Sequence, residues 1–154
     1  MDEAALDEQR IVPRTLIIVD PSSPHGEGGL DVLTPEDRAV TLMVTLGGRS
    51  AASLHDFAAA EEIDVSMAGL IYLDQVACRL SAQTADIDTI STHGSDAVGE
   101  IFHLLQRQPV SRVILPASLP GLESTDLSRL VRMCPVPVVV APAGGCRPEF
   151  SMAS

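Results

Sequence analysis

The segment SRVILPASLPGLESTDLSRLVRMCPVPVVVAP, residues 111–142, decides the fold class. It predicts a strand, a loop, a short helix and a second strand, because runs of β-branched residues flank a stretch with helical spacing. In nucleotide-binding α/β folds, the loop after such a strand holds phosphate with glycines and with the free N–H groups of a helix N-terminus. The sequence of this loop decides whether the chain keeps that ability.

The loop reads PASLPGL and starts at Pro116. Pro116 and Pro120 each lack an N–H donor. Glu123 and Asp126 place negative charge around the start of the following helix, which stabilises the helix but repels an anion. No Lys or Arg occurs in residues 113–128. The pattern therefore indicates a nucleotide-binding type of fold whose phosphate site has been lost.

Length and composition favour a single globular domain. The chain has 154 residues, of which 45% are hydrophobic and 20% are charged. We expect a polar leader over residues 1–13, an α/β domain over 14–142 and a tail over 143–154. No apolar run approaches the ~18 residues that span a bilayer, and the acidic start is unlike a signal peptide. These features predict a cytoplasmic protein.

The charge pattern excludes several classes of chemistry. All basic residues are Arg, so there is no lysine for a P-loop or a Schiff base. The formal net charge of −11 argues against nucleic acid or an anionic membrane as a partner, since both require a basic face.

Outward from the opening segment, the chain alternates strands and helices. Residues 14–20 form a continuous apolar run closed by an acid, which is typical of a central parallel strand. Residues 21–38 hold many prolines and glycines and should form at most one turn. Residues 39–46 could begin as a helix after Thr34-Pro35, but their β-branched residues favour a strand.

Helical spacing continues the pattern. We expect a first helix over 50–62, with Leu54, Phe57 and Ala58 inward, and a second from Asp64 as N-cap to Leu80, with Leu70, Leu73, Ala77 and Leu80 inward. A third should run from Ser95 to Pro109, with Ala97, Val98, Ile101, Leu104 and Leu105 inward. The last should follow Ser124 or Thr125 as cap, with Leu127, Leu130 and Val131 inward. Residues 86–92, 113–115 and 138–140 are the remaining strands. This alternation predicts an open, five-stranded parallel sheet of Rossmann-like α/β type with helices on both faces.

Metal, disulfide and catalytic sites find no support in the sequence. Cys78, Cys134 and Cys146 form no C-x-x-C pair, and we expect Cys78 on an apolar helix face. His25, His55, His93 and His103 lack metal-ligand spacing. Ser22, Ser23 and Ser118 lack the strand-turn context of a hydrolase nucleophile. We therefore assign no catalytic residue and no metal ligand.

Three motifs together resemble the universal stress protein family. They are Leu16-Ile17-Ile18-Val19-Asp20-Pro21-Ser22, the Gly94-Ser95-Asp96 helix start, and Cys134-Pro135-Val136-Pro137-Val138-Val139-Val140. The resemblance covers roughly residues 14–142. It implies sheet order 3-2-1-4-5 and a homodimer formed through the last strand, with Val136, Val138, Val139 and Val140 at the edge.

The resemblance also implies where a nucleotide would bind. Members that bind ATP resemble one another in a Gly-x-x-Gly loop after strand four, closed by Gly-Ser or Gly-Thr. This chain departs from that pattern: its loop is shorter, Pro116 replaces the first glycine, and Leu119 lies near the second. Only Thr125 and Asp20 remain of the set that would face a nucleotide.

Asp20 has two interpretations, which the sequence leaves open. A carboxylate at the carboxyl end of a central strand lies at the topological switch point, where ligands of open α/β sheets bind. It can also accept a backbone N–H in the following turn. Ser124 and Thr125 also have two interpretations, since each can cap the following helix or contact a ligand.

These observations favour a non-catalytic, dimeric regulatory or stress-response protein that acts through an unidentified protein partner and needs no cofactor. One alternative is weak binding of ATP or AMP, with slow hydrolysis through Asp20 and Thr125. Another is an uncharged small ligand in a crevice lined by Asp20, Pro116, Ala117, Leu119 and Ser124, because Leu119 and Leu122 suit an apolar compound better than a phosphate.

Overall fold

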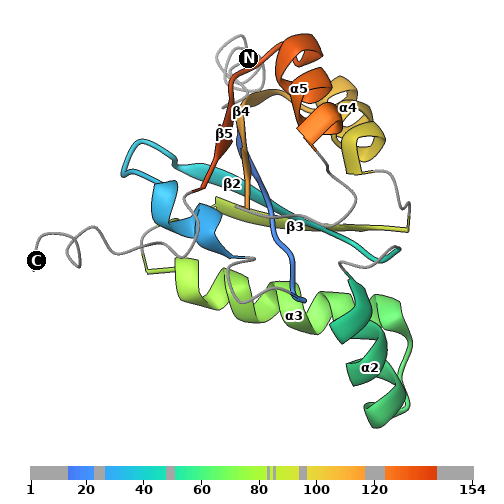
Figure 1. Cartoon of the computed structure of the whole chain (residues 1–154). Coiled ribbons are helices and arrows are strands. Elements are labelled where there is room, and N and C mark those ends of the chain that lie inside the picture. Colours follow the sequence, from blue (N-terminus) through green and yellow to red (C-terminus); the bar gives the residue numbers. More distant parts are fainter. Residues whose placement is uncertain are drawn as a thin grey trace, which may run out of the picture.

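The computed structural model describes residues 14–22, 27–47, 51–82, 84, 86–93, 97–116 and 124–141 (Figure 1). Strands and helices alternate through the described chain, as the sequence predicts. In chain order they are β1 (Arg14–Ile18), the 3-10 helix η1 (Gly28–Val32), β2 (Ala39–Thr45), α2 (Ala52–Glu61), α3 (Val65–Leu80), β3 (Asp86–Thr92), α4 (Ala97–Arg107), β4 (Val110–Leu115), α5 (Ser124–Met133) and β5 (Val138–Val140).

The five strands form one parallel sheet in the order β3-β2-β1-β4-β5, which confirms the expected topology. Leu16 of β1 is level with Thr41 of β2 and Val113 of β4, so the three central strands lie in close register. The preference for a strand over residues 39–46 is also confirmed. β3 and β5 are the two edges, and the switch in strand order falls between β1 and β4.

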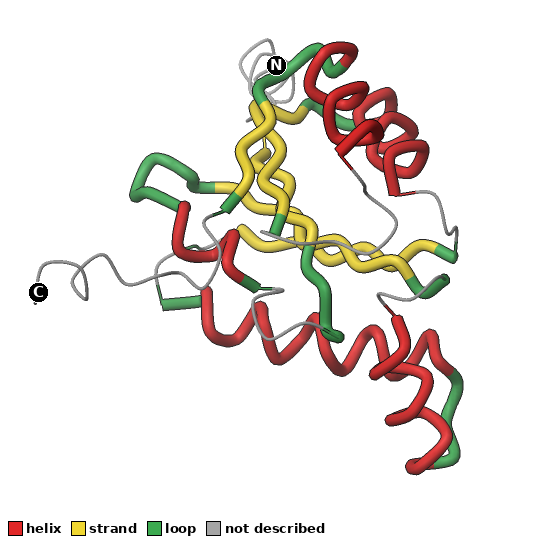
Figure 2. Tube along the Cα trace, in the orientation of Figure 1, coloured by secondary structure: helices red, strands yellow, loops and turns green. Residues whose placement is uncertain are grey.

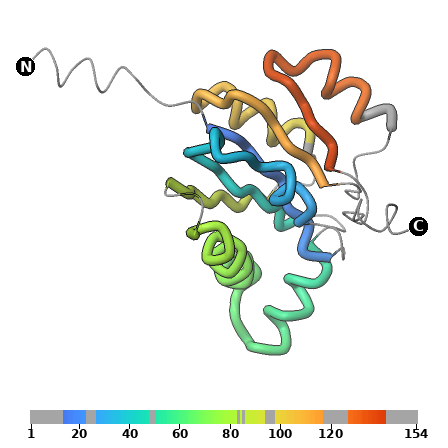
Figure 3. Tube along the Cα trace, turned by 90° about the vertical axis from the view of Figure 1, so that its left-hand side faces the viewer, coloured from blue at the N-terminus to red at the C-terminus, as the bar shows by residue number. Residues whose placement is uncertain are grey.

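Helices cover both faces of the sheet (Figures 2 and 3). Ile17 of β1 and Val19 just after it enter the hydrophobic cluster shared with α2 and α3, whereas Leu16 and Ile18 of β1 enter the cluster shared with α4 and α5. This alternation is what a strand buried on both sides requires, because successive side chains point to opposite faces. The expectation of a doubly covered sheet is confirmed.

The buried face of α3 differs from the predicted one. Leu70 was expected inward but is 51% exposed, while Gly69 is buried. A Cβ on Gly69 would lie 2.9 Å from Leu46 Cδ2, so the helix backbone comes very close to the sheet at this point. The close approach rotates the contact face toward Ala68, Gly69, Leu73, Val76 and Leu80. Hydrophobicity alone misses such a face because a glycine has no side chain to signal it.

Three further predictions about helix faces were wrong. Phe57 is 40% exposed and Val131 is 53% exposed, and Cys78 is also exposed. α3 and α5 pack on the sheet and α2 packs on α3, so each of these helices has an outer side that nothing among the described residues covers. A residue one position from the packed side is turned by about 100°, which is enough to expose it.

The segment from residue 21 to 38 contains one short 3-10 helix and a turn among its described residues, in place of a full helix. η1 has five residues, a little more than the single turn expected. Gly29 lets η1 lie directly on the sheet, since a Cβ there would be 2.8 Å from Ile114 Cγ2. Thr34 starts a turn rather than a helix, because its carbonyl accepts the N–H of Asp37 at 2.9 Å.

A polar network closes the amino end of the sheet. Asp37 accepts hydrogen bonds from the Thr15 hydroxyl at 2.6 Å, the Thr34 N–H at 2.8 Å and the Arg112 guanidinium at 2.7 Å. Arg14 forms an ion pair with Asp86 of the polar edge strand β3 at 3.0 Å. These contacts connect β1 to elements that are far from it in sequence.

Candidate functional site

Asp20 lies two residues beyond β1 at the carboxyl end of the sheet. The preceding Val19 still donates its N–H to the Met43 carbonyl of β2 at 3.0 Å, so the chain remains extended up to this point. The Asp20 side chain is 0% exposed. Pro116, the residue that follows β4, is also buried. These positions put Asp20 near the topological switch point, as the sequence predicts.

The two carboxylate oxygens of Asp20 differ in their surroundings. Oδ1 accepts the N–H of Ser22 at 3.0 Å, which is the backbone interaction expected of an Asx turn. Oδ2 is buried and has no hydrogen-bond partner among the described residues. Burial raises the pKa of the Asp20 carboxyl, and the bond from Ser22 offsets that rise only in part. The turn role of Asp20 is therefore present, and one buried oxygen is left over.

Ser22 joins this turn to the start of α2. Its Oγ accepts the N–H of Ser53 at 3.1 Å and donates to Ser53 Oγ at 3.2 Å. Ala51, the N-cap residue of α2, makes no side-chain capping bond, so Ser22 supplies the acceptor from a distant part of the chain. No local pattern indicates this contact, because the two serines are 31 positions apart.

A small cavity lies beside this turn, between the start of α2 and the middle of α3. Its volume is about 190 Å³, below the ~300 Å³ at which small-molecule pockets usually begin. Tyr72 forms part of its wall and donates its hydroxyl to Glu27 at 2.8 Å. Burial, and then the Glu27 carboxylate, raise the pKa of the Tyr72 hydroxyl well above its usual range. The remaining lining residues are Pro21, Ser53, Leu54, Phe57, Ala68, Ile71 and Gln75.

Several predicted site residues cannot be placed in this geometry. Ala117 and Leu119 lie outside the described residues, so the predicted crevice is described only at Asp20 and Pro116. Ser124 and Thr125 begin α5 as expected, but their side chains lie outside the description. Neither the capping roles nor the ligand roles of these residues are tested.

The described residues include no group of three or more His, Cys, Asp or Glu side chains that could hold a metal ion. His55 is hydrogen-bonded to the Leu46 carbonyl at 2.9 Å. His93 lies 3.5 Å from Ser66 Oγ. Within the same described ranges, no helix is long and apolar enough to cross a membrane.

Comparison with known proteins gives matches among solved structures. No family model and no curated protein matches the sequence. A universal stress protein family member from Burkholderia pseudomallei is similar with a TM-score of 0.59 and 16% identity, over 84% of this chain and 95% of that one. The universal stress protein from Archaeoglobus fulgidus has a TM-score of 0.55 and 17% identity, over 89% and 98% of the two chains.

A third structure, universal stress protein UspA from Lactobacillus plantarum, has a TM-score of 0.54 and 13% identity, over 86% of this chain and 100% of that one. At these identities the likeness establishes the fold. The sheet order agrees with the expectation drawn from the three motifs, and the parallel strands and the helices on both faces agree with the alternation of strands and helices in the sequence. The chain has the α/β fold of the universal stress proteins.

Proposed function

We propose that this chain is a stress-response protein of the universal stress protein type that acts as a homodimer through protein association and has lost the ATP site. The observation that carries the proposal is the chemistry around the switch point. Residues 113–128, where the triphosphate would lie, contain no Lys or Arg, Pro116 and Pro120 lack N–H donors, and Glu123 and Asp126 add negative charge. A triphosphate at this point would meet negative charge and few amide donors.

Arg112 is the nearest basic residue in sequence to the loop after β4, but its side chain is directed to the other end of the sheet. Its guanidinium donates to Asp37 at the amino end of the sheet. The carboxyl end therefore gains no positive charge from β4. Arginine and lysine are the side chains that normally neutralise phosphate groups, so their absence here supports the loss of nucleotide binding.

Titration calorimetry of the purified protein with ATP and with AMP tests this part of the proposal. We expect no saturable heat at millimolar nucleotide. Saturable binding would overturn the loss of the ATP site and favour the alternative of weak nucleotide binding, with or without slow hydrolysis. In that case Asp20→Ala should abolish the heat, because Asp20 is the retained position that would face the nucleoside.

The homodimer part of the proposal is supported by strand β5. Among the described residues β5 pairs with β4 alone, so its outer edge has unpaired backbone groups. Val140 is 41% exposed, and Val136, Val138 and Val139 are partly buried. An apolar strand edge of this kind favours pairing with a second chain. Pro137 limits the number of backbone hydrogen bonds that the pairing can form.

Light scattering coupled to size-exclusion chromatography tests the dimer. We expect a dimer for the natural sequence and a monomer for Val140→Lys, because a charged edge residue opposes strand pairing. Leu70→Lys is the matched control, since Leu70 is 51% exposed on α3, which contacts β2 and β3 at the other edge of the sheet. A monomeric natural protein, or equal dissociation by both variants, would contradict the proposal.

An uncharged small ligand at the switch point is a second candidate. It agrees with the surroundings of Asp20, whose buried Oδ2 has no hydrogen-bond partner among the described residues. A protonated Asp20 would then be a neutral hydrogen-bond donor, in agreement with the raised pKa of its carboxyl. A crystal structure with a bound compound between Asp20 and Ala117 would favour this candidate over protein association.

A further inference from the structure

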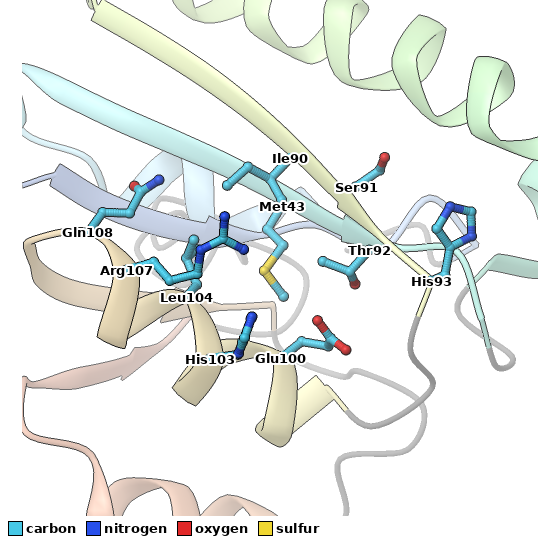
Figure 4. A pocket seen from close by; sticks show the side chains of 10 residues that line it. All are labelled: Met43, Ile90, Ser91, Thr92, His93, Glu100, His103, Leu104, Arg107 and Gln108. Carbon is cyan, nitrogen blue, oxygen red and sulfur yellow. The ribbon is translucent and has the colours of Figure 1, made fainter.

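A groove lies between the edge strand β3 and helix α4, on the face opposite α3 (Figure 4). Its volume is about 510 Å³, within the range of roughly 300–1,000 Å³ that small-molecule sites occupy. Met43 of β2 and Leu104 of α4 form a buried apolar floor, and Ile90 of β3 completes it. The groove is distinct from the switch point, because its lining includes neither Asp20 nor Pro116.

The sheet topology explains why this groove is open. α4 connects β3 to β4 and packs through Val98, Ile101 and Leu104 against residues of the central strands. Among the described residues, no helix therefore covers the outer part of β3 on this face. At the amino end, the groove meets Gln108, whose side-chain oxygen lies 3.4 Å from the Thr41 hydroxyl. The carboxyl end reaches Thr92 and His93.

Polar side chains of α4 converge on the apolar floor. Glu100, His103 and Arg107 project from the helix toward β2 and β3, as Figure 4 shows. They lie at positions i, i+3 and i+7, which share one side of a helix. None of the three has an ion pair or hydrogen bond among the described residues. Across the groove, the Thr92 hydroxyl oxygen is buried and also lacks a partner.

The two opposite charges stand at different ends of the groove. Glu100 is in the first turn of α4 and Arg107 is in the last. They are seven positions apart, which corresponds to about 10 Å along the helix axis. Leu104, Met43 and the His103 side chain lie between the charges. A complementary ligand has an anionic end, an apolar middle and a cationic end.

The charge of the whole protein narrows the ligand class further. A net charge of −11 repels free anions, so a simple carboxylate or phosphate would approach at a disadvantage. A zwitterion has no net charge and satisfies both unpartnered groups at once. A linear chain of about five methylenes would place its apolar part on the floor and leave its ends near Glu100 and Arg107.

We propose that the groove between β3 and α4 binds a linear ω-amino carboxylate, with the ligand carboxylate on Arg107 and the ligand ammonium on Glu100. This site is independent of the proposed loss of nucleotide binding, since the two share no residue. Its success or failure therefore leaves the ATP and dimer tests unaffected.

ε-Aminocaproate is the probe that tests the proposal, measured by nitrogen-15 NMR titration and calorimetry on the full chain. We expect saturable millimolar binding, with shifts of the Ile90, Thr92 and Leu104 amides. Caproate lacks the ammonium and hexylamine lacks the carboxylate, so each should bind about tenfold more weakly, the loss expected for one charge-assisted hydrogen bond. If ε-aminocaproate does not saturate, or if caproate or hexylamine binds equally well, the ligand class is wrong.

Variants at the two charged ends complete the test. Arg107→Gln and Glu100→Gln should each lower ε-aminocaproate affinity about tenfold, because each removes one charged partner. Arg132→Gln is the matched control, since Arg132 is likewise an exposed arginine in the last turn of a helix, on α5. An affinity that stays unchanged in Arg107→Gln, or that falls equally in Arg132→Gln, would overturn the assignment.

Discussion

Replacing Asp37 by Ala should remove the polar network that closes the amino end of the sheet. The Asp37 side chain is 9% exposed and accepts hydrogen bonds from Thr15, Thr34 and Arg112. Thr15 is 2% exposed, so its hydroxyl would lose its acceptor away from water, which costs about 1–3 kcal/mol. The Arg112 side chain is 25% exposed and can regain water in part. We expect a total loss of about 3 kcal/mol in the free energy of unfolding.

The effect should depend on pH with a definite sign. Burial alone would raise the pKa of the Asp37 carboxyl, but the bonds from Thr15, Thr34 and Arg112 outweigh burial and lower that pKa. A carboxyl with a lowered pKa in the folded state stabilises the protein above its unfolded pKa, about 4. This contribution is lost as pH falls through the folded pKa. The difference between natural protein and variant should therefore shrink below pH ~4.

Urea denaturation at neutral pH and at several acidic values measures both effects. In a thermal scan, the loss at neutral pH corresponds to a fall in Tm of roughly 10 °C for a domain of this size. Glu36→Ala is the control, because Glu36 lies in the same turn with an exposed side chain, and it should change stability by less than about 0.5 kcal/mol. A loss below about 1 kcal/mol for Asp37→Ala, or a difference that does not vary with pH, would refute the reasoning.

Three further substitutions test other parts of the fold. Asp20→Asn should stabilise the protein at neutral pH, because it removes a buried charge, and this gain should disappear as pH falls through the raised pKa of Asp20. A gain that stays constant in urea denaturation at several pH values would contradict the prediction. Gly29→Ala should lower the free energy of unfolding by about 1–3 kcal/mol in urea denaturation, since the added Cβ would be 2.8 Å from Ile114 Cγ2. Gly28 is partly exposed, so Gly28→Ala should change stability little, and equal losses in the two variants would argue against the close approach. Tyr72→Phe should lower the free energy of unfolding by about 1 kcal/mol, because the hydrogen bond from the Tyr72 hydroxyl to the Glu27 carboxylate is lost. If that carboxylate is the partner responsible, Tyr72→Phe should cause no further loss in a Glu27→Gln background.

Much of this fold follows from local patterns in the sequence. The continuous apolar runs ending at Asp20 and at Leu115 predict strands covered on both sides, and alternation with helical stretches predicts a parallel sheet. The three family-like motifs add the strand order, which the structure confirms. Asp20 is also predicted at its position, because the end of a central strand is recognisable from the sequence alone.

Helix faces and polar contacts were predicted less well. The buried side of α3 passes through Gly69 instead of Leu70, since the distance between helix and sheet sets which side chains are covered. The Ser22–Ser53 contact and the Asp37 network join residues that are far apart in sequence. No local signal announces such pairs, because each partner alone resembles an ordinary polar surface residue.

The sequence by itself determined the class of the fold, the loss of basic residues near the switch point and the apolar character of the last strand. These are properties of consecutive residues, which local periodicity and charge express directly. The tertiary structure alone decided that Glu100 and Arg107 face Met43 and Thr92 across a groove. The reason is geometric: the crossover from β3 to β4 carries α4 over the central strands, and only this path determines which side chains of distant segments meet.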